Sequence, residues 1–350
     1  MILHFLDSRS FGGIEAHVET LARAQAEAGE NVAVLMWRFY PDSQTRVRFE
    51  TAGLRLLSAG GSLAGLFRVP ARLPVSLIHT HGYKANILGR LAGRMRGLSV
   101  VSTFHAGERG AFPVNVYQAI DERSSFLGKR IAVSQPIADA LPFAARVISN
   151  FVDVPPLNLT RKPARGIVFA GRFSHEKGPD LFCAVAQLLA GQAEFAACGE
   201  GAMLNELRRS NSAFVSFDGF ACDMEKVWEQ TGLLLMPSRS EGLPMAALEA
   251  MARGIPVAAA AVGALPDVIE HGVDGFLFPA GDISGAVRCV RQWLDMDEAN
   301  KAVMRAAARR TIELRYSSAK GLAEVFDVYG RKSEAAAVSM RSNVQSSLGR

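Results

Sequence analysis

Residues Pro237–Pro256 read PSRSEGLPMAALEAMARGIP and predict a turn followed by a helix. They come after a short apolar run, Leu233–Met236, which predicts a strand. Prolines, serines and glycine predict a turn over Pro237–Gly242, and the alanine, leucine and methionine residues beyond it favour a helix. Pro244 suits the first helical position, and a Gly-Ile-Pro sequence ends the run. The helix is therefore expected to begin soon after the strand.

Two carboxylates, Glu241 and Glu249, flank the entrance of this predicted helix. The first turn of a helix offers unpaired N–H groups and partial positive charge, which favour a phosphate group. A carboxylate there is a poor phosphate ligand but a good acceptor for sugar hydroxyl groups. The stretch therefore indicates a ligand with both a phosphate and a polyol. The alternative is that Glu241 is a solvated turn residue and Glu249 a surface residue that complements the helix dipole.

The whole composition is typical of a globular protein with two domains, since the chain has 350 residues, 49% of them hydrophobic and 21% charged. A net charge of +5 permits an anionic partner. The apolar segment Ile2–Leu6 is too short for a signal peptide, and no apolar run has membrane-spanning length. Four cysteines lie far apart without a CxxC pair, so we expect reduced, mostly buried thiols in a cytoplasmic protein and no metal cluster.

The first half of the chain alternates strands and helices, which predicts a doubly wound, mostly parallel sheet. Its first unit is strand, loop, helix, strand, and the loop contains Gly12 and Gly13, which can bring backbone N–H groups to a phosphate or can simply form a tight turn. His105 leaves a strand at the edge where open α/β sheets bind ligands. We expect strands at 2–6, 31–37, 54–57, 76–80, 99–104, 130–133 and 146–149, and helices at 14–28, 83–96, 115–127 and 135–141.

Basic residues in this half allow two interpretations. Arg90, Arg94 and Arg96 lie toward the end of the predicted helix 83–96, where cations complement the helix dipole. They could equally contact anionic lipid headgroups, as could a short amphipathic helix within 58–73, which contains the sequence LFRVPAR. Both interpretations stay open at this point.

A proline-rich linker, 153–165, separates the first half from a second alternating series. In that series, Arg172 and Lys177 lie in a glycine-flanked loop after a strand. A full charge about 4 Å from a phosphate contributes about 4 kcal/mol at an effective dielectric constant near 20, against about 0.3–1 kcal/mol from a helix end. A leaving diphosphate therefore needs these cations or a metal, and no acidic DxD cluster follows a strand. The alternative is that both are solvated loop charges. Further strands are expected at 166–170, 194–197, 213–217, 257–260 and 275–278.

Together these segments resemble the retaining glycosyltransferases of family 4, which have the GT-B fold. The matching pieces occur in order along almost the whole chain: GGIE at 12–15, HTHG at 79–82, TFHA at 103–106, AVS at 132–134, SNFVD at 149–153, GRFSHEKG at 171–178, GEG at 199–201, SEGLPMAALEAMARGIPV at 240–257 and DGFLF at 274–278. The resemblance implies an α/β protein with two Rossmann-like doubly wound domains that face a cleft. The expected domains are an acceptor-side unit, 1–152 plus a crossing helix 317–331, a nucleotide-sugar unit, 153–316, and a disordered tail, 332–350.

The resemblance also implies roles for individual residues. Arg172 and Lys177 would stabilise the leaving diphosphate, and Glu249 would bind the ribose hydroxyl groups. Glu241, with the amides of Gly242 and Leu243, would hold the hexose. Gly13 would bring its backbone to the phosphates, and His105 would approach the transferred sugar. The other implied substrate-binding residues are Gly12, His81, Gly199 and Gly201. No metal or other cofactor is implied.

The expected function is transfer of a hexosyl unit from UDP- or GDP-hexose to an acceptor hydroxyl group, with retention, in the assembly of a cell-surface glycan or glycolipid. The expected partners are the nucleotide sugar and a glycan or glycolipid acceptor, with no nucleic acid. A cytoplasmic location, peripheral at the inner face of an anionic membrane, is compatible with the basic surface. Two alternatives share the fold: a nucleotide-sugar 2-epimerase, for which Glu15 and Glu108 are the nearby carboxylates, and a non-catalytic nucleotide-sugar-binding protein.

Overall fold

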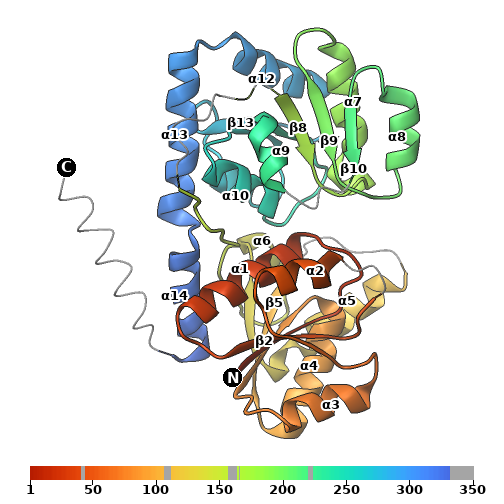
Figure 1. Cartoon of the computed structure of the whole chain (residues 1–350), viewed down its shortest axis with the longest axis vertical. Helices are drawn as coiled ribbons and strands as arrows, with labels where there is room; N and C mark the ends of the chain where they lie inside the picture. The colour runs from red at the N-terminus through yellow and green to blue at the C-terminus, as the bar shows by residue number, and fades with distance from the viewer. Residues whose placement is uncertain (41–43, 106–111, 157–163, 165, 220–223, 332–350) are drawn as a thin grey trace, which may run out of the picture. The chain divides into compact units, whose positions relative to one another are not determined.

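The computed structural model describes residues 1–40, 44–105, 112–156, 164, 166–219 and 224–331. The chain forms two compact units (Figure 1). The first consists of Met1–Phe151 with the segment that starts at Ser317, and the second is Val152–Tyr316. Each unit contains one parallel sheet between helices, so the predicted α/β fold class with two Rossmann-like domains is confirmed.

The N-terminal sheet has seven strands in the order β3-β2-β1-β4-β5-β6-β7. Parallel strands need crossover helices, and these cover both faces of the sheet. Its strands are β1 (Ile2–Leu6), β2 (Val32–Met36), β3 (Leu56–Ser58), β4 (Leu77–His81), β5 (Ser99–Phe104), β6 (Lys129–Ala132) and β7 (Arg146–Val147). Its helices are α1 (Gly13–Glu27), α2 (Gln44–Thr51), α3 (Leu63–Ala71), α4 (Tyr83–Arg96), α5 (Val114–Arg123), α6 (Gln135–Ala140) and α14 (Ser318–Tyr329), with a 3-10 turn η1 (Ser124–Leu127).

The C-terminal sheet has six strands in the order β10-β9-β8-β11-β12-β13. Its core includes Phe169 of β8, whose ring contacts Phe173 in the following loop and Phe182 of α7. Its strands are β8 (Gly166–Ala170), β9 (Phe195–Cys198), β10 (Ser216–Gly219), β11 (Thr231–Met236), β12 (Val257–Ala260) and β13 (Gly275–Phe278). Its helices are α7 (Pro179–Leu188), α8 (Leu204–Asn211), α9 (Met224–Gln230), α10 (Met245–Ala252), α11 (Leu265–Val268), α12 (Ile283–Asp295) and α13 (Glu298–Arg315), with a 3-10 turn η2 (His175–Lys177).

The last helix, α14, packs on the N-terminal sheet beside α1, as Figure 1 shows. Leu322, Val325 and Phe326 of α14 share a core cluster with residues of β1, β4 and β5. Gly321 lies directly on the Phe151 ring, because a Cβ atom there would be 1.9 Å from Phe151 Cδ1. The predicted crossing helix therefore completes the core of the first unit, and Phe151 is buried under it.

Several predictions about local structure were wrong. Helix α2 was missed, because only Thr45 and Phe49 of its residues are buried and its apolar pattern is weak. Pro244 is the N-cap residue rather than the first helical residue, with an extended ψ of 126°. The strand expected at 213–217 is β10, at Ser216–Gly219.

Other predictions can be checked only in part. The three described cysteines, Cys183, Cys198 and Cys289, are buried and are not joined in disulfides, and Cys222 lies outside the described residues. The tail 332–350 and Glu108 also lie outside them. Within the described chain no helix is long and apolar enough to cross a membrane.

Candidate active site

The C-terminal sheet has a reversal of strand order between β8 and β11. From β8 the chain proceeds outward through β9 to β10, and from β11 it proceeds in the other direction through β12 to β13. Ligands of open α/β sheets bind outside the carboxyl ends of the strands at such a reversal. The loops that leave these two strands, 171–178 and 237–244, are the ones in which the sequence placed the basic and acidic site residues.

Glycines bring three loops of this edge into close contact. At Gly199 and Gly201, φ is 143° and 153°, values that favour glycine. A Cβ atom at Gly199 would lie 1.9 Å from the carbonyl oxygen of Gly171, and one at Gly201 would lie 2.4 Å from that of Phe173. On the other side, a Cβ atom at Gly178 would lie 2.3 Å from the carbonyl oxygen of Pro237. The GEG loop, the basic loop and the Pro237 loop therefore need glycine to pack together.

Lys177 and Glu241 join the basic loop to the loop after β11. The Lys177 ammonium group donates to Glu241 Oε2 at 2.5 Å, and the Ser238 hydroxyl group donates to Oε1 at 2.7 Å. The Glu241 carboxylate is almost fully buried, whereas the Lys177 side chain is 28% exposed. A buried carboxylate needs such compensation, and both oxygens of Glu241 have a partner. The lysine remains accessible to an anionic ligand.

A second ion pair holds the same two loops together. Arg239 donates to both carboxylate oxygens of Asp180, at 2.9 and 2.6 Å, and to the carbonyl oxygen of His175 at 2.8 Å. Its backbone N–H donates to the carbonyl oxygen of Glu176 at 2.7 Å. The hydrogen bonds from Arg239 lower the pKa of Asp180. The bidentate pair fixes the start of α7, and the two carbonyl contacts fix the basic loop, relative to β11.

The remaining predicted residues of this unit lie around the same edge. Arg172 is exposed on the loop after β8, and Glu249 is half-buried on α10. The Gly242 carbonyl oxygen accepts from the Ala264 N–H group at 2.9 Å, and Leu243 is buried. Their ligand contacts therefore stay predictions.

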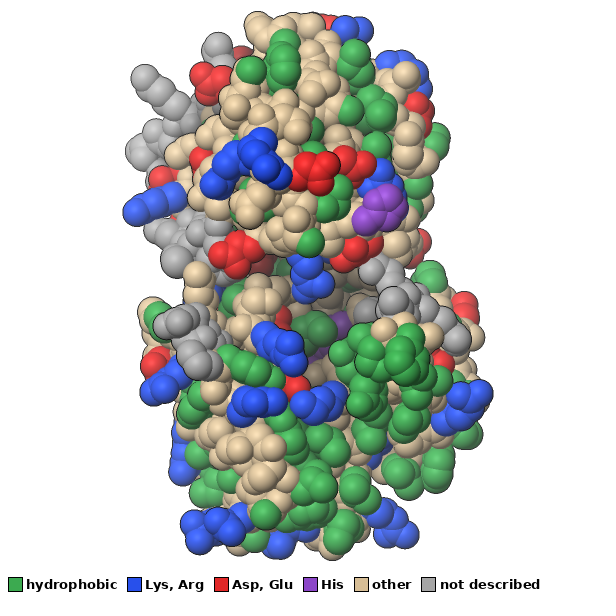
Figure 2. All heavy atoms as spheres, turned by 90° about the vertical axis from the view of Figure 1, so that its right-hand side faces the viewer, with side chains coloured by type: hydrophobic (Ala, Val, Ile, Leu, Met, Phe, Trp, Pro, Cys, Tyr) green, Lys and Arg blue, Asp and Glu red, His purple; other side chains and the backbone are tan. Residues whose placement is uncertain are grey.

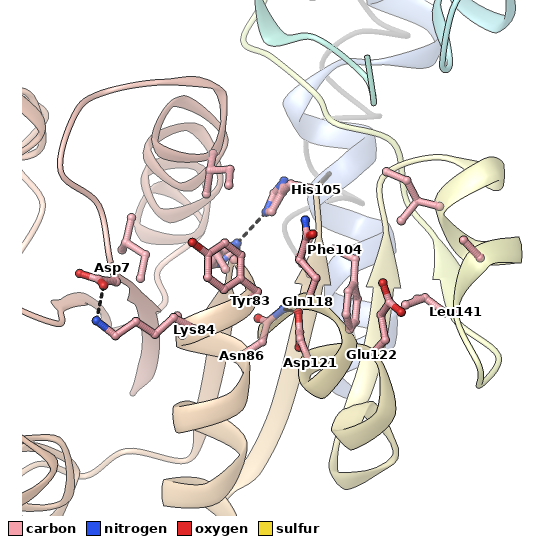
Figure 3. Close-up of a pocket in the computed structure, with 18 of the residues that line it drawn as sticks. Asp7, Tyr83, Lys84, Asn86, Phe104, His105, Gln118, Asp121, Glu122 and Leu141 are labelled. Carbon is pink, nitrogen blue, oxygen red and sulfur yellow. Dashed lines mark hydrogen bonds and ion pairs between the residues drawn. The ribbon is translucent and has the colours of Figure 1, made fainter. Parts of the chain in front are cut away.

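The N-terminal sheet has its reversal of strand order between β1 and β4, and a pocket lies there (Figure 3). Its volume is about 270 Å³. The walls come from the end of β1, the start of α1 and α4, the end of β5, helix α5 and α6. Polar side chains from several of these elements line it: Asp7, Glu15, His81, Lys84, Asn86, His105, Gln118, Asp121 and Glu122.

One rim of this pocket holds an ion pair. Lys84 Nζ lies 2.6 Å from Asp7 Oδ2, as the dashed line in Figure 3 marks, and 4.8 Å from the ring centre of Trp37. The Tyr40 hydroxyl group donates to the other oxygen of Asp7 at 3.0 Å. The aspartate is therefore neutralised and oriented by two partners. This rim offers a fixed carboxylate and an ammonium group for hydroxyl or phosphate groups.

Arg90 corrects one interpretation of the sequence. Its side chain is fully buried and pairs with Asp121 at 2.5 Å, so it cannot contact a lipid headgroup. It also donates to the hydroxyl groups of Ser102 and Ser124, while Asn86 donates to Asp121 at 3.0 Å. Burial raises the pKa of Asp121, and the neighbouring arginine opposes that shift. The pair organises the floor of the pocket, and Arg94 and Arg96 remain exposed.

Behind the pocket lies a cluster of five buried or half-buried histidines. His79 and His81 alternate on β4 and therefore face the same side, and β1 places His4 directly beside His79. His17 comes from α1, and His105 follows β5. Burial lowers the pKa of His4 to about 4 and that of His105 to about 3, and it lowers the pKa values of the other three well below the ordinary range. The five rings are therefore neutral at pH 7.

These histidines are also the described residues best placed to hold a metal. Two overlapping triads, His4/His79/His81 and His17/His81/His105, have ligand atoms within 4.8 Å of one another. Most of their nitrogens bond to each other or to neighbouring polar groups. A metal would have to displace those bonds, so the cluster fits a hydrogen-bonded core better than a ligand set. Near Arg172 and Lys177 the described residues include no comparable group.

The glycine loop before α1 uses one of its N–H groups within its own helix. The N–H group of Gly12 donates to Glu15 Oε2 at 2.9 Å, so the glutamate of the first turn caps the helix. Gly13 is the first helical residue and is exposed. Its contact with a phosphate stays a prediction, and Glu15 has a local structural role.

Sequence reasoning missed most of this unit's polar site. Asp7, Lys84, Gln118 and Glu122 line the pocket, and His4, His17, His79, Gln25 and Tyr329 build the cluster behind it. The alternating histidines of the HTHG sequence were a signal for a shared face. Their partners lie far away in the sequence, so only the strand order and register bring them together.

Comparison with known proteins agrees with this architecture. A family model described as "Glycosyltransferase Family 4" matches residues 11–154, and one described as "Glycosyl transferases group 1" matches residues 164–296. An Escherichia coli protein, UDP-Gal:alpha-D-GlcNAc-diphosphoundecaprenol alpha-1,3-galactosyltransferase, is 24% identical over 83% of this chain and 85% of its own. D-inositol 3-phosphate glycosyltransferase 1 of Catenulispora acidiphila is 26% identical over 90% of this chain and 89% of its own.

Solved structures show the same fold. HepE of Anabaena in complex with UDP-glucose superposes with a TM-score of 0.80 at 18% identity, covering 94% of this chain and 99% of that one. TarM of S. aureus, solved with UDP and other ligands, gives 0.79 at 12% identity, covering 94% and 99%. Because the two family models together match more than half of the sequence, the chain belongs to the family 4 glycosyltransferases, which have the GT-B fold.

Proposed function

We propose that this glycosyltransferase moves a hexosyl unit from a UDP-hexose to a hydroxyl group of a glycan or glycolipid acceptor, with retention and without a metal ion at the diphosphate. The observation that carries the proposal is the Lys177–Glu241 pair at the strand-order reversal of the C-terminal sheet. It sets a cation and a sugar-hydroxyl acceptor side by side where such sheets bind ligands. Uridine is favoured over guanosine by the printed name of the E. coli relative and by the UDP-glucose bound to HepE.

Lys177 and Arg172 supply the positive charge for the leaving diphosphate. Both belong to the loop after β8, and the glycines of the GEG loop let backbone approach it closely. A cation about 4 Å from the phosphate contributes about 4 kcal/mol at an effective dielectric constant near 20. Preorganised cations of this kind stabilise charge that develops as the bond between the anomeric carbon and the phosphate oxygen breaks.

Glu241 serves to hold the hexose and is unsuited to attack its anomeric carbon. One of its oxygens accepts from Lys177 and the other from Ser238, and both contacts reduce its nucleophilicity. In the proposed step the acceptor oxygen bonds to the anomeric carbon on the face from which the phosphate departs. The acceptor's proton passes to the leaving phosphate oxygen. Glu249 on α10 would accept hydrogen bonds from the ribose hydroxyl groups.

The pocket of the N-terminal unit is the proposed acceptor site. Carboxylates and amides line it, among them Asp7, Gln118 and Glu122, and these groups suit the hydroxyl groups of a sugar. His105 and His81 form its inner wall, where they would approach the transferred sugar. Lys84 on the rim could bind a phosphate linked to the acceptor sugar.

The outer side of the same pocket helix is apolar and exposed. Val116, Tyr117 and Ile120 of α5 are 46%, 48% and 45% exposed, and Phe112 before the helix is 81% exposed. Figure 2 shows hydrophobic side chains gathered on this unit, with lysines and arginines around them. An exposed apolar surface next to a sugar pocket supports a lipid-linked acceptor at the surface of an anionic membrane. The enzyme would act there as a peripheral protein on the cytoplasmic side.

A nucleotide panel tests the donor. Calorimetry with UDP, GDP and ADP is expected to show the tightest binding for UDP, and UDP-hexoses with no acceptor should give slow hydrolysis with no change at the sugar's C2. An epimerised nucleotide sugar would instead establish the 2-epimerase alternative. Binding without hydrolysis or transfer, across a panel of sugar acceptors, would favour the non-catalytic alternative. Product NMR with an active acceptor decides retention, and activity unchanged by EDTA supports the absence of a metal.

Vesicle flotation tests the membrane surface. The wild-type protein should float with vesicles that contain phosphatidylglycerol, and the double variant Val116→Glu/Ile120→Glu should stay in solution. Val303 on α13 is 68% exposed, so Val303→Glu is a matched control that should still float. Equal flotation of both variants would remove α5 from the membrane proposal.

A further inference from the structure

A chain of hydrogen bonds leads from the pocket to the last helix. His105 Nε2 lies 3.2 Å from His81 Nδ1, and His81 Nε2 lies 3.0 Å from His4 Nδ1. His4 Nε2 lies 2.7 Å from Gln25 Oε1 on α1, and Gln25 Nε2 donates to the Tyr329 hydroxyl group of α14 at 3.1 Å. Each ring uses one nitrogen toward the pocket and the other away from it.

The chain continues for two more links. The Tyr329 oxygen lies 2.7 Å from His79 Nδ1, and His79 Nε2 lies 2.7 Å from Thr103 Oγ1. His4, His79 and Gln25 are fully buried, and His81 nearly so. These rings and the Gln25 amide are therefore shielded from solvent, and the chain reaches the pocket at His105.

Neutral imidazoles make such a chain directional. A neutral ring has one N–H donor and one acceptor nitrogen, so the donor at one end sets the donor of every ring after it. Gln25 sets the direction of the chain, because its amide oxygen only accepts hydrogen bonds and its amide nitrogen only donates them. With its oxygen toward His4, the proton of His4 is on Nε2, that of His81 is on Nε2, and that of His105 is on Nε2.

The placement of the Gln25 amide sets this direction, since its oxygen lies against His4 Nε2 and its nitrogen against the Tyr329 hydroxyl group. O–H donors make bonds near 2.7–2.8 Å and N–H donors make longer ones near 2.9–3.0 Å. The 2.7 Å contact between Tyr329 and His79 Nδ1 fits a phenol that donates to an imidazole, and the 3.1 Å contact between Gln25 and Tyr329 fits an amide N–H donor. Both contacts agree with the amide oxygen of Gln25 facing His4.

We propose that Gln25, acting through His4 and His81, holds His105 as the neutral Nε2–H tautomer, so that its Nδ1 lone pair accepts a hydrogen bond from a substrate hydroxyl group in the pocket. Figure 3 shows the His105 ring at the pocket, with the bond to the neighbouring imidazole leaving from one nitrogen only. Gln25, His4 and His81 are positioning residues, since they act through His105. The catalytic consequence rests on the proposed function, whereas the tautomer does not.

The tautomer is measured directly on the free protein. Selective ¹⁵N-histidine labelling, with His105→Asn for assignment and EDTA in the buffer, gives the protonated nitrogen of His105 by NMR. The wild type should show Nε2–H. In Gln25→Leu the His4 Nε2 proton would have no acceptor, and a buried unpaired N–H is the costlier defect, so His105 should shift largely to Nδ1–H. Gln25→Glu supplies only an acceptor and should retain Nε2–H.

Clear outcomes would overturn the proposal. These are an Nδ1–H tautomer in the wild type, the same tautomer in Gln25→Leu as in the wild type, or a metal-shifted His105 signal that appears without EDTA. If Gln25→Leu does not fold, Gln25→Met makes the same removal with an unbranched side chain. His271, in the other unit, is the internal control and its signals should stay unchanged.

Kinetics then test the consequence separately. Gln25→Leu should lower kcat/KM roughly tenfold, as expected for one hydrogen bond to substrate, and Gln25→Glu should restore most of it. A tautomer change with no kinetic change would remove His105 from substrate binding and leave the chain's effect on the tautomer standing. Absence of any transferase activity would refute the proposed function while the NMR result still decides the tautomer.

Discussion

The two sheet edges differ in the groups that they present to a polar ligand. In the C-terminal unit, the edge between β8 and β11 holds fixed charges, Lys177 against Glu241 and Arg239 against Asp180. In the N-terminal unit, the wall behind the pocket consists of histidines that burial keeps neutral. Full charges suit anionic groups of a ligand, whereas neutral rings suit its hydroxyl groups. The two edges thus differ in the charge of these groups, although the rim of the N-terminal pocket also carries the ion pair Asp7–Lys84.

The largest effect should follow from removing charge on the C-terminal side. Lys177→Ala takes the cation from the proposed diphosphate site and leaves Glu241 buried with Ser238 as its remaining hydrogen-bond partner of the two. We expect kcat to fall by about 10²–10³, the size of effect typical for one preorganised group that stabilises transition-state charge. Steady-state rates with UDP-hexose measure it.

Its control is Arg288→Ala, which removes a cation that is 70% exposed in a surface pair on α12. That variant should keep its rate within about twofold, because surface pairs contribute little. If Lys177→Ala were as active as this control, the charged edge would have no part in the chemistry.

The buried pair Arg90–Asp121 tests the floor of the N-terminal pocket. Arg90→Met would leave the Asp121 carboxylate buried with one amide partner, Asn86. Removing one partner of a buried pair typically destabilises by about 3–5 kcal/mol. Urea unfolding should show that loss, and the double variant Arg90→Met/Asp121→Leu should recover most of it. Equal stability of Arg90→Met and wild type would mean that water reaches Asp121.

Acid should weaken the N-terminal unit through its histidines. His4 has a folded pKa of about 4, against 6.5 for an exposed histidine. Between these values the unfolded chain binds more protons than the folded chain, so the free energy of unfolding falls as pH drops from 6.5 toward 4. His4 alone should cost roughly 2 kcal/mol between pH 7 and pH 5.

Hydrogen exchange at the two pH values locates this effect. Amides of β1 and β4 should lose protection at pH 5 while those of β8 and β11 change less. His4→Asn should reduce the pH dependence of unfolding. Greater stability at pH 5 than at pH 7 would contradict the neutral state of the cluster.

The sequence predicted the charged edge better than the neutral one, and for a physical reason. Arg172, Lys177 and Glu241 stand in glycine-marked loops directly after apolar strands, so their positions follow from local pattern. The Lys177–Glu241 contact could be expected once β8 and β11 were neighbours. The histidine cluster depends on five separate segments, and the link from Gln25 to Tyr329 joins residues 304 positions apart.

The local sequence pattern gave a wrong prediction where tertiary contacts decide whether a side chain is buried or exposed. Arg90 stands among the basic residues of α4 and looks like a surface cation, but its position on the helix turns it toward Asp121. No residue near Arg90 in the sequence predicts that partner, because the packing of α4 against α5 brings Asp121 to Arg90. Helix α2 was missed for a different reason: too few of its residues are buried to produce an apolar pattern in the sequence.

The position of α14 has a consequence for the order in which the enzyme is made. Gly321 seats this helix on Phe151, and Tyr329 bonds to His79 and Gln25. The N-terminal unit leaves the ribosome first, but its core is complete only after α14 has been synthesised. At about 5–20 residues per second, translation of the intervening segment takes roughly ten to forty seconds. During that interval the face of the sheet that α14 later covers is exposed, and a chaperone that binds apolar strands would find its target there.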